Sequence, residues 1–179
     1  GTIVLDDMSN LPRSFREVMG RDLPVTRSKV EEWRESADGT QKATIRLCDE
    51  EVIETVLIPD GERQTLCIST QVGCAVGCVF CASGLYGLRR NLSAGEIVFQ
   101  FLIAVSRLAQ RGQGRLTNVV VMGIGEPLHN YKALVRSIHA LNAPWGGQLG
   151  ARRITVSTSG VVDRIRQLAE EPWSVGLAL

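Results

Sequence analysis

The segment LCISTQVGCAVGCVFCASG, residues 66–84, joins a short apolar run to three closely spaced cysteines. Residues 66–70 have the composition of a strand, and the loop that follows carries Cys74, Cys78 and Cys81. This C-x3-C-x2-C spacing offers three thiolates, with no fourth Cys or His in line. Structural zinc usually takes four ligands in two separated pairs, whereas a [4Fe–4S] cluster held by three cysteines keeps one iron open. The triplet therefore predicts an iron–sulfur cluster; a zinc site, or a disulfide with one spare thiol, remains an alternative.

Strand and helix patterns alternate from this segment to the end of the chain. Further strands are predicted over 118–122, 153–157 and 173–179, and helices over 94–110, 131–141 and 161–168. Ser93 and Glu96 form a capping-box pattern at the start of the first of these helices. This alternation predicts an α/β fold with parallel strands. Ahead of it, strands over 43–47 and 51–58 indicate a β-hairpin, and residues 12–19 a short helix.

Polar and glycine-rich segments follow the predicted strands directly. They are GIGEP (123–127) and STSG (157–160), in addition to the cysteine loop. Because parallel strands carry their sites at their carboxyl ends, the three loops should converge. The glycines let backbone carbonyls approach a ligand, and Glu126 could face that ligand or merely begin a helix. Ser157 could bind the ligand or cap the next helix, a role for which Ser159 is better placed.

The remaining chemical groups allow more than one interpretation. Cys67 on the first parallel strand is either a small apolar filler or an active-site thiol. Arg89 and Arg90 are the better candidates for contacts with phosphates, because their segment borders the proposed site. Arg152 and Arg153 could also meet phosphates, and Arg115 with its helix neighbours could equally be solvated surface charge.

Composition narrows the class of protein. The chain has 179 residues and a formal net charge of +1, which neither favours nor excludes a polyanionic partner. Five cysteines, an odd number, argue against a secreted disulfide framework. We find no secretory signal and no apolar run of about 18 residues. The sequence therefore predicts a soluble cytoplasmic protein with no membrane partner.

Four ordered runs make the chain similar to the RlmN/Cfr family of radical S-adenosylmethionine (SAM) RNA methyltransferases, and closer to its RlmN branch. They are IETVLIPDGERQTLCISTQVGC (53–74), CVFCASGLYGLRRNLSAGEI (78–97), NVVVMGIGEPLHN (118–130) and RRITVSTSGVV (152–162). The resemblance implies a partial radical-SAM (β/α) barrel. It also implies methylation of C2 of an adenine in 23S rRNA, and of an adenine in tRNA, with SAM, a [4Fe–4S] cluster and an external electron donor such as flavodoxin or ferredoxin.

The resemblance also implies roles for individual residues. Cys74, Cys78 and Cys81 would hold the cluster, and the predicted SAM contacts are Gly125, Glu126 and Ser157. Glu54 falls where the family has its proton acceptor. Cys67 falls where the family has the thiol that resolves a covalent RNA–protein adduct.

The resemblance further predicts that the chain is part of a longer protein. Residues 1–40 would be the remnant of an accessory domain, 41–64 a β-hairpin lead-in and 65–179 a barrel that stops at its fourth strand. The family's methyl-carrying cysteine lies later, and no cysteine follows Cys81, so we expect the chain alone to be inactive. Two alternatives are a non-catalytic metal- or nucleotide-binding α/β module and a different radical SAM enzyme. The IETV…LC…VGC spacing and the GLRRNL run argue against the second.

Overall fold

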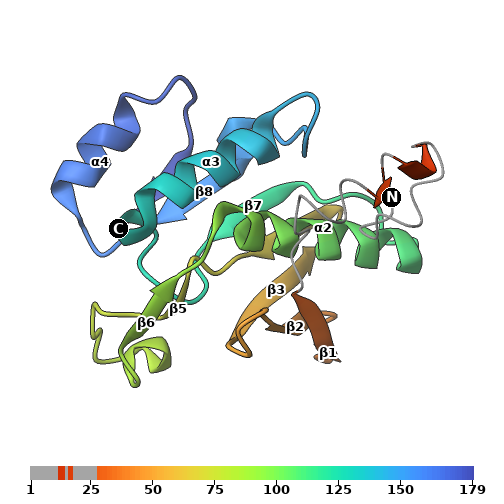
Figure 1. The fold of residues 1–179 in the computed structure, drawn as a ribbon, viewed down its shortest axis with the longest axis horizontal. Coiled ribbons are helices and arrows are strands. Elements are labelled where there is room, and N and C mark those ends of the chain that lie inside the picture. The colour runs from red at the N-terminus through yellow and green to blue at the C-terminus, as the bar shows by residue number, and fades with distance from the viewer. Residues whose placement is uncertain (1–11, 15, 18–27) are drawn as a thin grey trace.

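The computed structural model describes residues 12–14, 16–17 and 28–179 (Figure 1). Arg13, Ser14, Arg16 and Glu17 are helical, and the rest of the helix predicted over 12–19 lies outside the described residues. The strands are β1 (Lys29–Glu35), β2 (Gln41–Arg46), β3 (Val52–Asp60), β4 (Arg63–Cys67), β5 (Gln71–Gly73), β6 (Leu88–Asn91), β7 (Asn118–Val121), β8 (Ile154–Ser157) and β9 (Gly176–Ala178). The helices are α2 (Ala94–Arg111), α3 (Tyr131–Asn142) and α4 (Val162–Ala169), with short 3-10 turns at η2 (Ala82–Gly84), η3 (Pro127–Asn130) and η4 (Ala151–Arg153).

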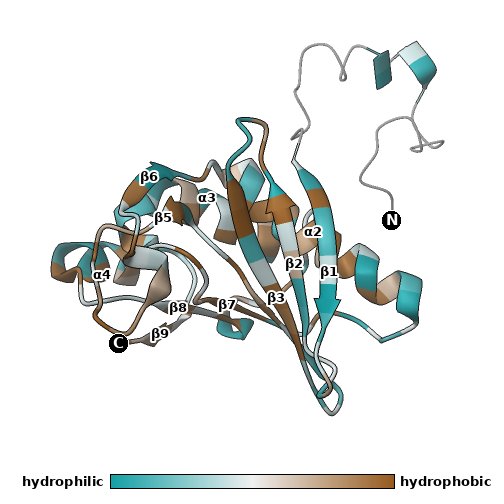
Figure 2. Cartoon of the chain, turned by 90° about the horizontal axis from the view of Figure 1, so that it is seen from below, coloured by the Kyte–Doolittle hydropathy of each residue, from teal (hydrophilic) through white to brown (hydrophobic). Residues whose placement is uncertain are grey.

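Seven of these strands form one open sheet in the order β1-β2-β3-β4-β7-β8-β9. The pairs from β1 to β4 are antiparallel, and β4, β7, β8 and β9 pair in parallel. The predicted α/β fold, with parallel strands that follow a β-hairpin, is therefore confirmed. Strand β1 was not predicted, because KVEEWRE is mostly polar; Figure 2 shows it as largely hydrophilic, in contrast to the more hydrophobic β3.

The helices α2, α3 and α4 cover one face of this sheet (Figure 1). Alternate strand residues point toward them and are buried, as expected from the two-residue period of a strand. The buried strand residues of this core include Ile45, Leu57, Leu66, Val119 and Val156. The other face, which carries the intervening residues, is only partly buried, and no helix of the described chain covers it.

Helix α2 begins and ends as its sequence predicts. The Ser93 hydroxyl accepts from the amide of Glu96, and the Glu96 carboxylate accepts from the amide of Ser93, which is the predicted capping box. The helix ends at Gly112, whose φ of 64° is left-handed and suits glycine. The described part of the chain contains no helix long and apolar enough to cross a bilayer.

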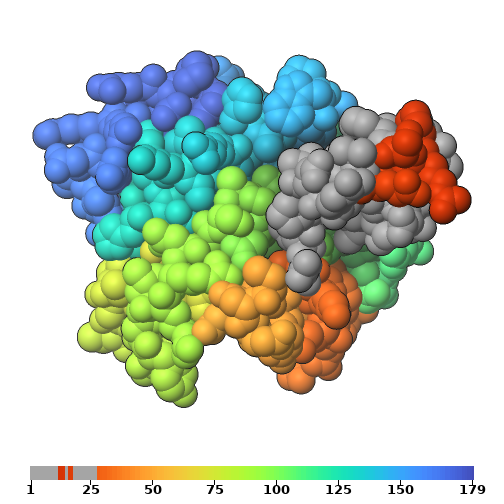
Figure 3. Space-filling model, in the orientation of Figure 1, coloured from red at the N-terminus to blue at the C-terminus, as the bar shows by residue number. Residues whose placement is uncertain are grey.

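The cysteine loop projects on a small arm of its own. Strands β5 and β6 pair in an antiparallel manner and form a separate two-stranded sheet at the base of this loop. In the space-filling view the arm extends beside the turn between β2 and β3, with a notch between them (Figure 3). The arm thus places the cysteines next to the carboxyl ends of the parallel strands.

Candidate active site

The three clustered cysteines lie on the loop between β5 and β6. The amide of Cys74 donates to the carbonyl of Gly87 over 3.1 Å, which closes the base of the loop, and the amide of Cys81 donates to the carbonyl of Cys78 over 3.0 Å. All three thiols are free and partly exposed. Within the described ranges, no three His, Cys, Asp or Glu side chains are grouped as they would be around a metal ion. It is the donor chemistry, three free thiols on one loop, that suits an iron–sulfur cluster.

The cysteine arm is tied to the glycine-rich loop that follows β7. The amides of Thr70 and Gln71 both donate to the carbonyl of Ile124, over 2.9 and 3.2 Å. The Gln71 side-chain oxygen accepts from the amide of Glu126 over 2.8 Å. These bonds hold the first two loops together at the carboxyl ends of β4 and β7.

Glu126 ties the second loop to the third. Its carboxylate accepts from the Thr158 hydroxyl (2.8 Å), from the Ser159 amide and hydroxyl (2.8 and 2.9 Å) and from the Leu128 amide (3.0 Å). Burial raises the pKa of Glu126, but these hydrogen bonds outweigh burial and leave the pKa below its usual value. The predicted convergence of the three loops is therefore confirmed. A direct contact between SAM and this carboxylate, which is only 4% exposed, stays a prediction.

Gly125 sits where only glycine fits. Its φ is +106°, and a Cβ atom at this position would lie 2.5 Å from the Cβ of Gln71. The loop therefore approaches the cysteine arm closely because residue 125 lacks a side chain. Its predicted contact with SAM remains a prediction.

Ser157 ends β8 and is partly exposed. Helix α4 begins after Val161 with no side-chain cap, so the interpretation of Ser157 or Ser159 as its capping residue is wrong. Ser159 instead binds Glu126. The Ser157 hydroxyl makes no hydrogen bond with any described residue and is free to meet a ligand.

Glu54 and Cys67 share the sheet face that the helices leave uncovered. Cys67 pairs with Val56 of β3, and Glu54 lies two residues from Val56, so the period of the strand places both side chains on one face. Cys67 also pairs with Val120, and Val120 with Thr155, which puts Ser157 on the same face. The register thus brings together three site residues that the sequence predicts separately.

A cavity of about 480 Å³ joins Glu54 to the cysteine arm. Its lining includes Glu54, Ile124 and the arm residues Gly73, Ala82 and Tyr86. Lys42 on β2 forms an ion pair with Glu54, with 2.8 Å between Nζ and Oε1. The cavity is therefore bordered by the predicted proton acceptor on one side and by the cysteine loop on the other.

Relatives of known name resemble the chain over nearly all of its length. The chain is 50% identical to the probable dual-specificity RNA methyltransferase RlmN 3 of Opitutus terrae, with 97% of this chain and 50% of the relative covered. It is 46% identical to the probable dual-specificity RNA methyltransferase RlmN of Dictyoglomus thermophilum, with 96% and 49% covered. The predicted resemblance to the RlmN/Cfr family is confirmed. No protein-family model matches the chain.

A solved structure supports the same assignment. The crystal structure of a radical SAM methyltransferase from Sphaerobacter thermophilus aligns with a TM-score of 0.94 at 46% identity, and the alignment covers 98% of this chain and 52% of that one. The α/β fold is thus that of part of a radical SAM methyltransferase. The chain spans about half the length of the RlmN-type relatives that it matches.

Two buried amide side chains that hold the loops of the candidate site together were not predicted. Besides its bond to Glu126, Gln71 donates to the side-chain oxygen of Asn91 over 2.7 Å. Asn130 donates to the carbonyls of Thr70 and Leu92 over 2.8 and 2.7 Å. The sequence did carry a signal for them, a Gln and an Asn inside otherwise apolar or glycine-rich runs. A buried amide needs hydrogen-bond partners, so such a residue indicates a structural link.

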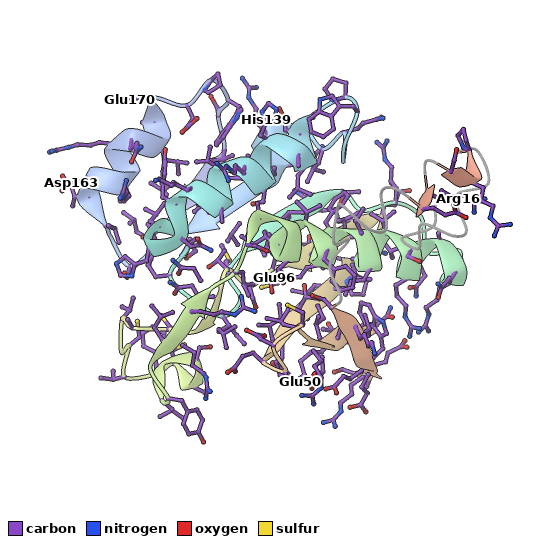
Figure 4. The ribbon with its side chains drawn as sticks, in the orientation of Figure 1. Arg16, Glu50, Glu96, His139, Asp163 and Glu170 are labelled. Atoms are coloured by element: carbon purple, nitrogen blue, oxygen red, sulfur yellow. The ribbon has the colours of Figure 1, made fainter. Side chains whose placement is uncertain are left out.

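Arg89 and Arg90 are both paired with carboxylates within the protein, and their contact with phosphates stays a prediction. Arg89 pairs with Glu51 over 2.7 Å. Arg90 contacts Asp49 over 2.5 Å and makes a two-point contact with Glu96 over 3.0 and 2.8 Å. The hydrogen bond from Arg90 is the main cause that lowers the pKa of Asp49. Figure 4 shows Glu96 at the start of α2, so these contacts brace the cysteine arm against the helix and the hairpin.

We expect Cys67 to be alkylated more slowly than Cys48 between pH 7 and pH 9. Burial raises the pKa of the Cys67 thiol, and an opposing hydrogen bond from the Met122 backbone only partly offsets this, whereas Cys48 is exposed. Because the thiolate is the reactive form, fewer Cys67 side chains react at a given pH. Peptide mass spectrometry after timed iodoacetamide treatment measures both sites in one sample. Equal rates would contradict the partly buried position of Cys67.

Proposed function

We propose that this chain provides the cluster- and SAM-binding half of a radical SAM methyltransferase that methylates C2 of adenine in 23S rRNA and tRNA. The observation that carries the proposal is the junction of three loops at the carboxyl ends of the parallel strands, with the cysteine triplet on one of them. The relatives' names, dual-specificity RNA methyltransferase RlmN, support RNA as the substrate. On this proposal the chain alone does not turn over, because the methyl-carrying cysteine expected of the family is not among its residues.

The described residues would divide the work as follows. Cys74, Cys78 and Cys81 would hold the cluster, which when bound supplies the electron that cleaves SAM. Gly125 allows its loop to pack closely against Gln71 of the cysteine arm, and the unpaired hydroxyl of Ser157 is available to a ligand. C2 of adenine is not nucleophilic, so this chemistry needs a radical route, with an external donor such as flavodoxin or ferredoxin.

Two residues on the uncovered sheet face would act on the RNA: one would accept the adenine C2 proton, and the other would resolve the covalent RNA–protein adduct. Glu54 is partly exposed and forms an ion pair with Lys42, and on this proposal its carboxylate would accept the C2 proton. Cys67 lies on the adjacent strand β4. Its raised pKa favours the thiol over the thiolate, and on this proposal that thiol would resolve the covalent RNA–protein adduct. An adenine in folded RNA would have to leave its stack to reach this face.

Anaerobic reconstitution of the chain with iron and sulfide tests the proposal. We expect about four iron atoms per chain and a broad visible absorbance, because three thiolates suffice to hold a [4Fe–4S] cluster. Replacing Cys74, Cys78 and Cys81 together by serine should reduce the bound iron at least tenfold, since serine is a much poorer ligand for iron in such clusters. Iron and sulfide analysis and the absorbance spectrum are the measurements.

The control is Cys48→Ser, because Cys48 is exposed and belongs to the β2–β3 turn and not to the cysteine loop. It should retain the full iron content. SAM added to the reduced, reconstituted chain should change its electron paramagnetic resonance spectrum. A colourless chain that takes up zinc but no iron would instead identify a metal-binding module and refute the proposal.

A further inference from the structure

Ion pairing sorts the arginines of the described chain into two groups. Arg34, Arg46, Arg89, Arg90 and Arg111 are each bound to a carboxylate. By contrast Arg63, Arg115 and Arg153 make no side-chain hydrogen bond or ion pair with any described residue. Arg136 and Arg152 also lack such a partner among the described residues, but only Arg63, Arg115 and Arg153 line the same surface hollow.

This hollow, of about 830 Å³, lies at the end of the sheet opposite the cysteine loop. Arg63 is the first residue of β4, Arg115 precedes β7 and Arg153 directly precedes β8. All three line the hollow, and its floor includes Phe101 and Leu116. Glu62 is the one acidic side chain among the residues that line it, so the guanidinium groups outnumber the carboxylates three to one.

The strand order arranges these cations in a row. Strands β4, β7 and β8 are consecutive neighbours in the sheet, about 4.8 Å apart, so three arginines at or just ahead of their starts are spread over about 10 Å across the sheet. The rise along one nucleic-acid strand is about 3.4 Å per nucleotide, so such a row matches about three nucleotides. A single phosphate would occupy only one part of it. Three exposed like charges with a single carboxylate among them are an arrangement that a polyanion stabilises.

We propose that the hollow formed by Arg63, Arg115 and Arg153 binds the phosphate backbone of the RNA substrate, away from the catalytic end of the sheet. This inference rests on the proposed function, because that function makes RNA the substrate, but it concerns a surface other than the candidate active site. The arginines contact phosphates and no base, so the hollow contributes affinity and orientation without sequence preference.

Fluorescence anisotropy with a labelled single-stranded RNA, measured over a series of salt concentrations, tests the proposal on the 179-residue chain. We expect the triple variant Arg63→Gln, Arg115→Gln and Arg153→Gln to bind at least tenfold more weakly. The slope of log K against log salt should become less steep by about 2, at about 0.7 for each lost phosphate contact. Each single variant should show about a third of that change in slope.

A second triple variant serves as the matched control. Arg13→Gln, Arg34→Gln and Arg166→Gln remove the same charge from exposed arginines that are paired with carboxylates elsewhere on the surface. This control should keep most of the affinity and the wild-type slope. If both triple variants weaken binding equally, the effect is one of net charge and the proposal is wrong.

Competition with inorganic phosphate at constant ionic strength distinguishes a hollow that binds an RNA backbone from one that binds a single small anion. If phosphate displaces the RNA while the salt slopes of wild type and the hollow variant are the same, the hollow binds a single small anion and the backbone proposal is overturned. Measurements of cluster and SAM binding test the proposed function independently of the RNA-binding measurements. If those measurements succeed and the arginine variants bind RNA as tightly as wild type, only the inference about the hollow fails.

Discussion

Replacing Glu126 by alanine should lower the free energy of unfolding by about 3 kcal/mol, a large effect for one residue. The carboxylate accepts four hydrogen bonds, and its removal leaves the buried amide of Leu128 and the buried hydroxyl of Thr158 without their acceptor. Glu126→Gln keeps the shape of the side chain but points its NH2 group at hydrogen-bond donors. We therefore expect the free energy of unfolding to fall by about 2 kcal/mol. Urea denaturation followed by circular dichroism measures both.

Glu170→Gln is the control for these variants. Glu170 is exposed at the end of α4, where Figure 4 shows it at the molecular surface, and its replacement should change stability by less than about 0.5 kcal/mol. If Glu126→Ala were as mild as this control, the carboxylate would not be the tie between the loops that follow β7 and β8.

The same carboxylate makes stability depend on pH in a defined direction. The pKa of Glu126 is lower in the folded chain than its usual value of 4.5, so the unfolded chain binds more protons between the two values. Its contribution to stability is present above pH 4.5 and is lost as the pH falls through the folded pKa. Wild type should therefore lose more stability on acidification than Glu126→Gln does.

Local patterns were sufficient to predict most strands and helices. The run NVVVM gave β7, and the pairing of Ser93 with Glu96 gave the start of α2. These signals are local, because a capping box or a buried strand is encoded within a few residues. The placement of GIGEP and STSG after strands likewise predicted that their loops meet.

What the sequence did not show depends on partners far along the chain. Thr158 and Ser159 lie more than thirty residues from Glu126, and no local pattern marks them as its hydrogen-bond donors. Strand β1 is held by pairing with β2 and not by its own polar sequence. Arg90 looked free because its partner Asp49 lies 41 residues away along the chain; its nearer partner, Glu96, is only six residues away on α2. Long-range pairing decided each case.

The β5–β6 arm was also missed, since its strands have three and four residues and pair only across the whole cysteine loop. Gly73 is central to this pairing. Its φ is +74°, and a Cβ atom there would lie 2.0 Å from the carbonyl oxygen of Gly87, closer than any real contact. That carbonyl is the acceptor for the Cys74 amide, so the base of the loop closes only if residue 73 lacks a side chain.

We therefore expect Gly73→Ala to open the arm. Amide exchange at Cys74 should accelerate about 100-fold, and the reconstituted chain should lose most of its iron, because the three cysteines no longer share a closed loop. Hydrogen–deuterium exchange followed by mass spectrometry measures the opening without any cluster bound. The fold beyond the arm should persist, since the helices and the seven-stranded sheet do not depend on this contact.

Gly87→Ala is the matched control that separates steric clash from backbone strain. Gly87 has nearly the same φ, +69°, but an added Cβ would have nothing within 4 Å. Both substitutions place alanine in a left-handed conformation, which costs about 1–2 kcal/mol, and only Gly73→Ala adds the clash with the Gly87 carbonyl. Exchange at Cys74 should thus rise about tenfold in Gly87→Ala. Equal acceleration in the two variants would mean that backbone strain alone governs the arm, and that the close approach of Gly73 to Gly87 does not hold the cysteine loop shut.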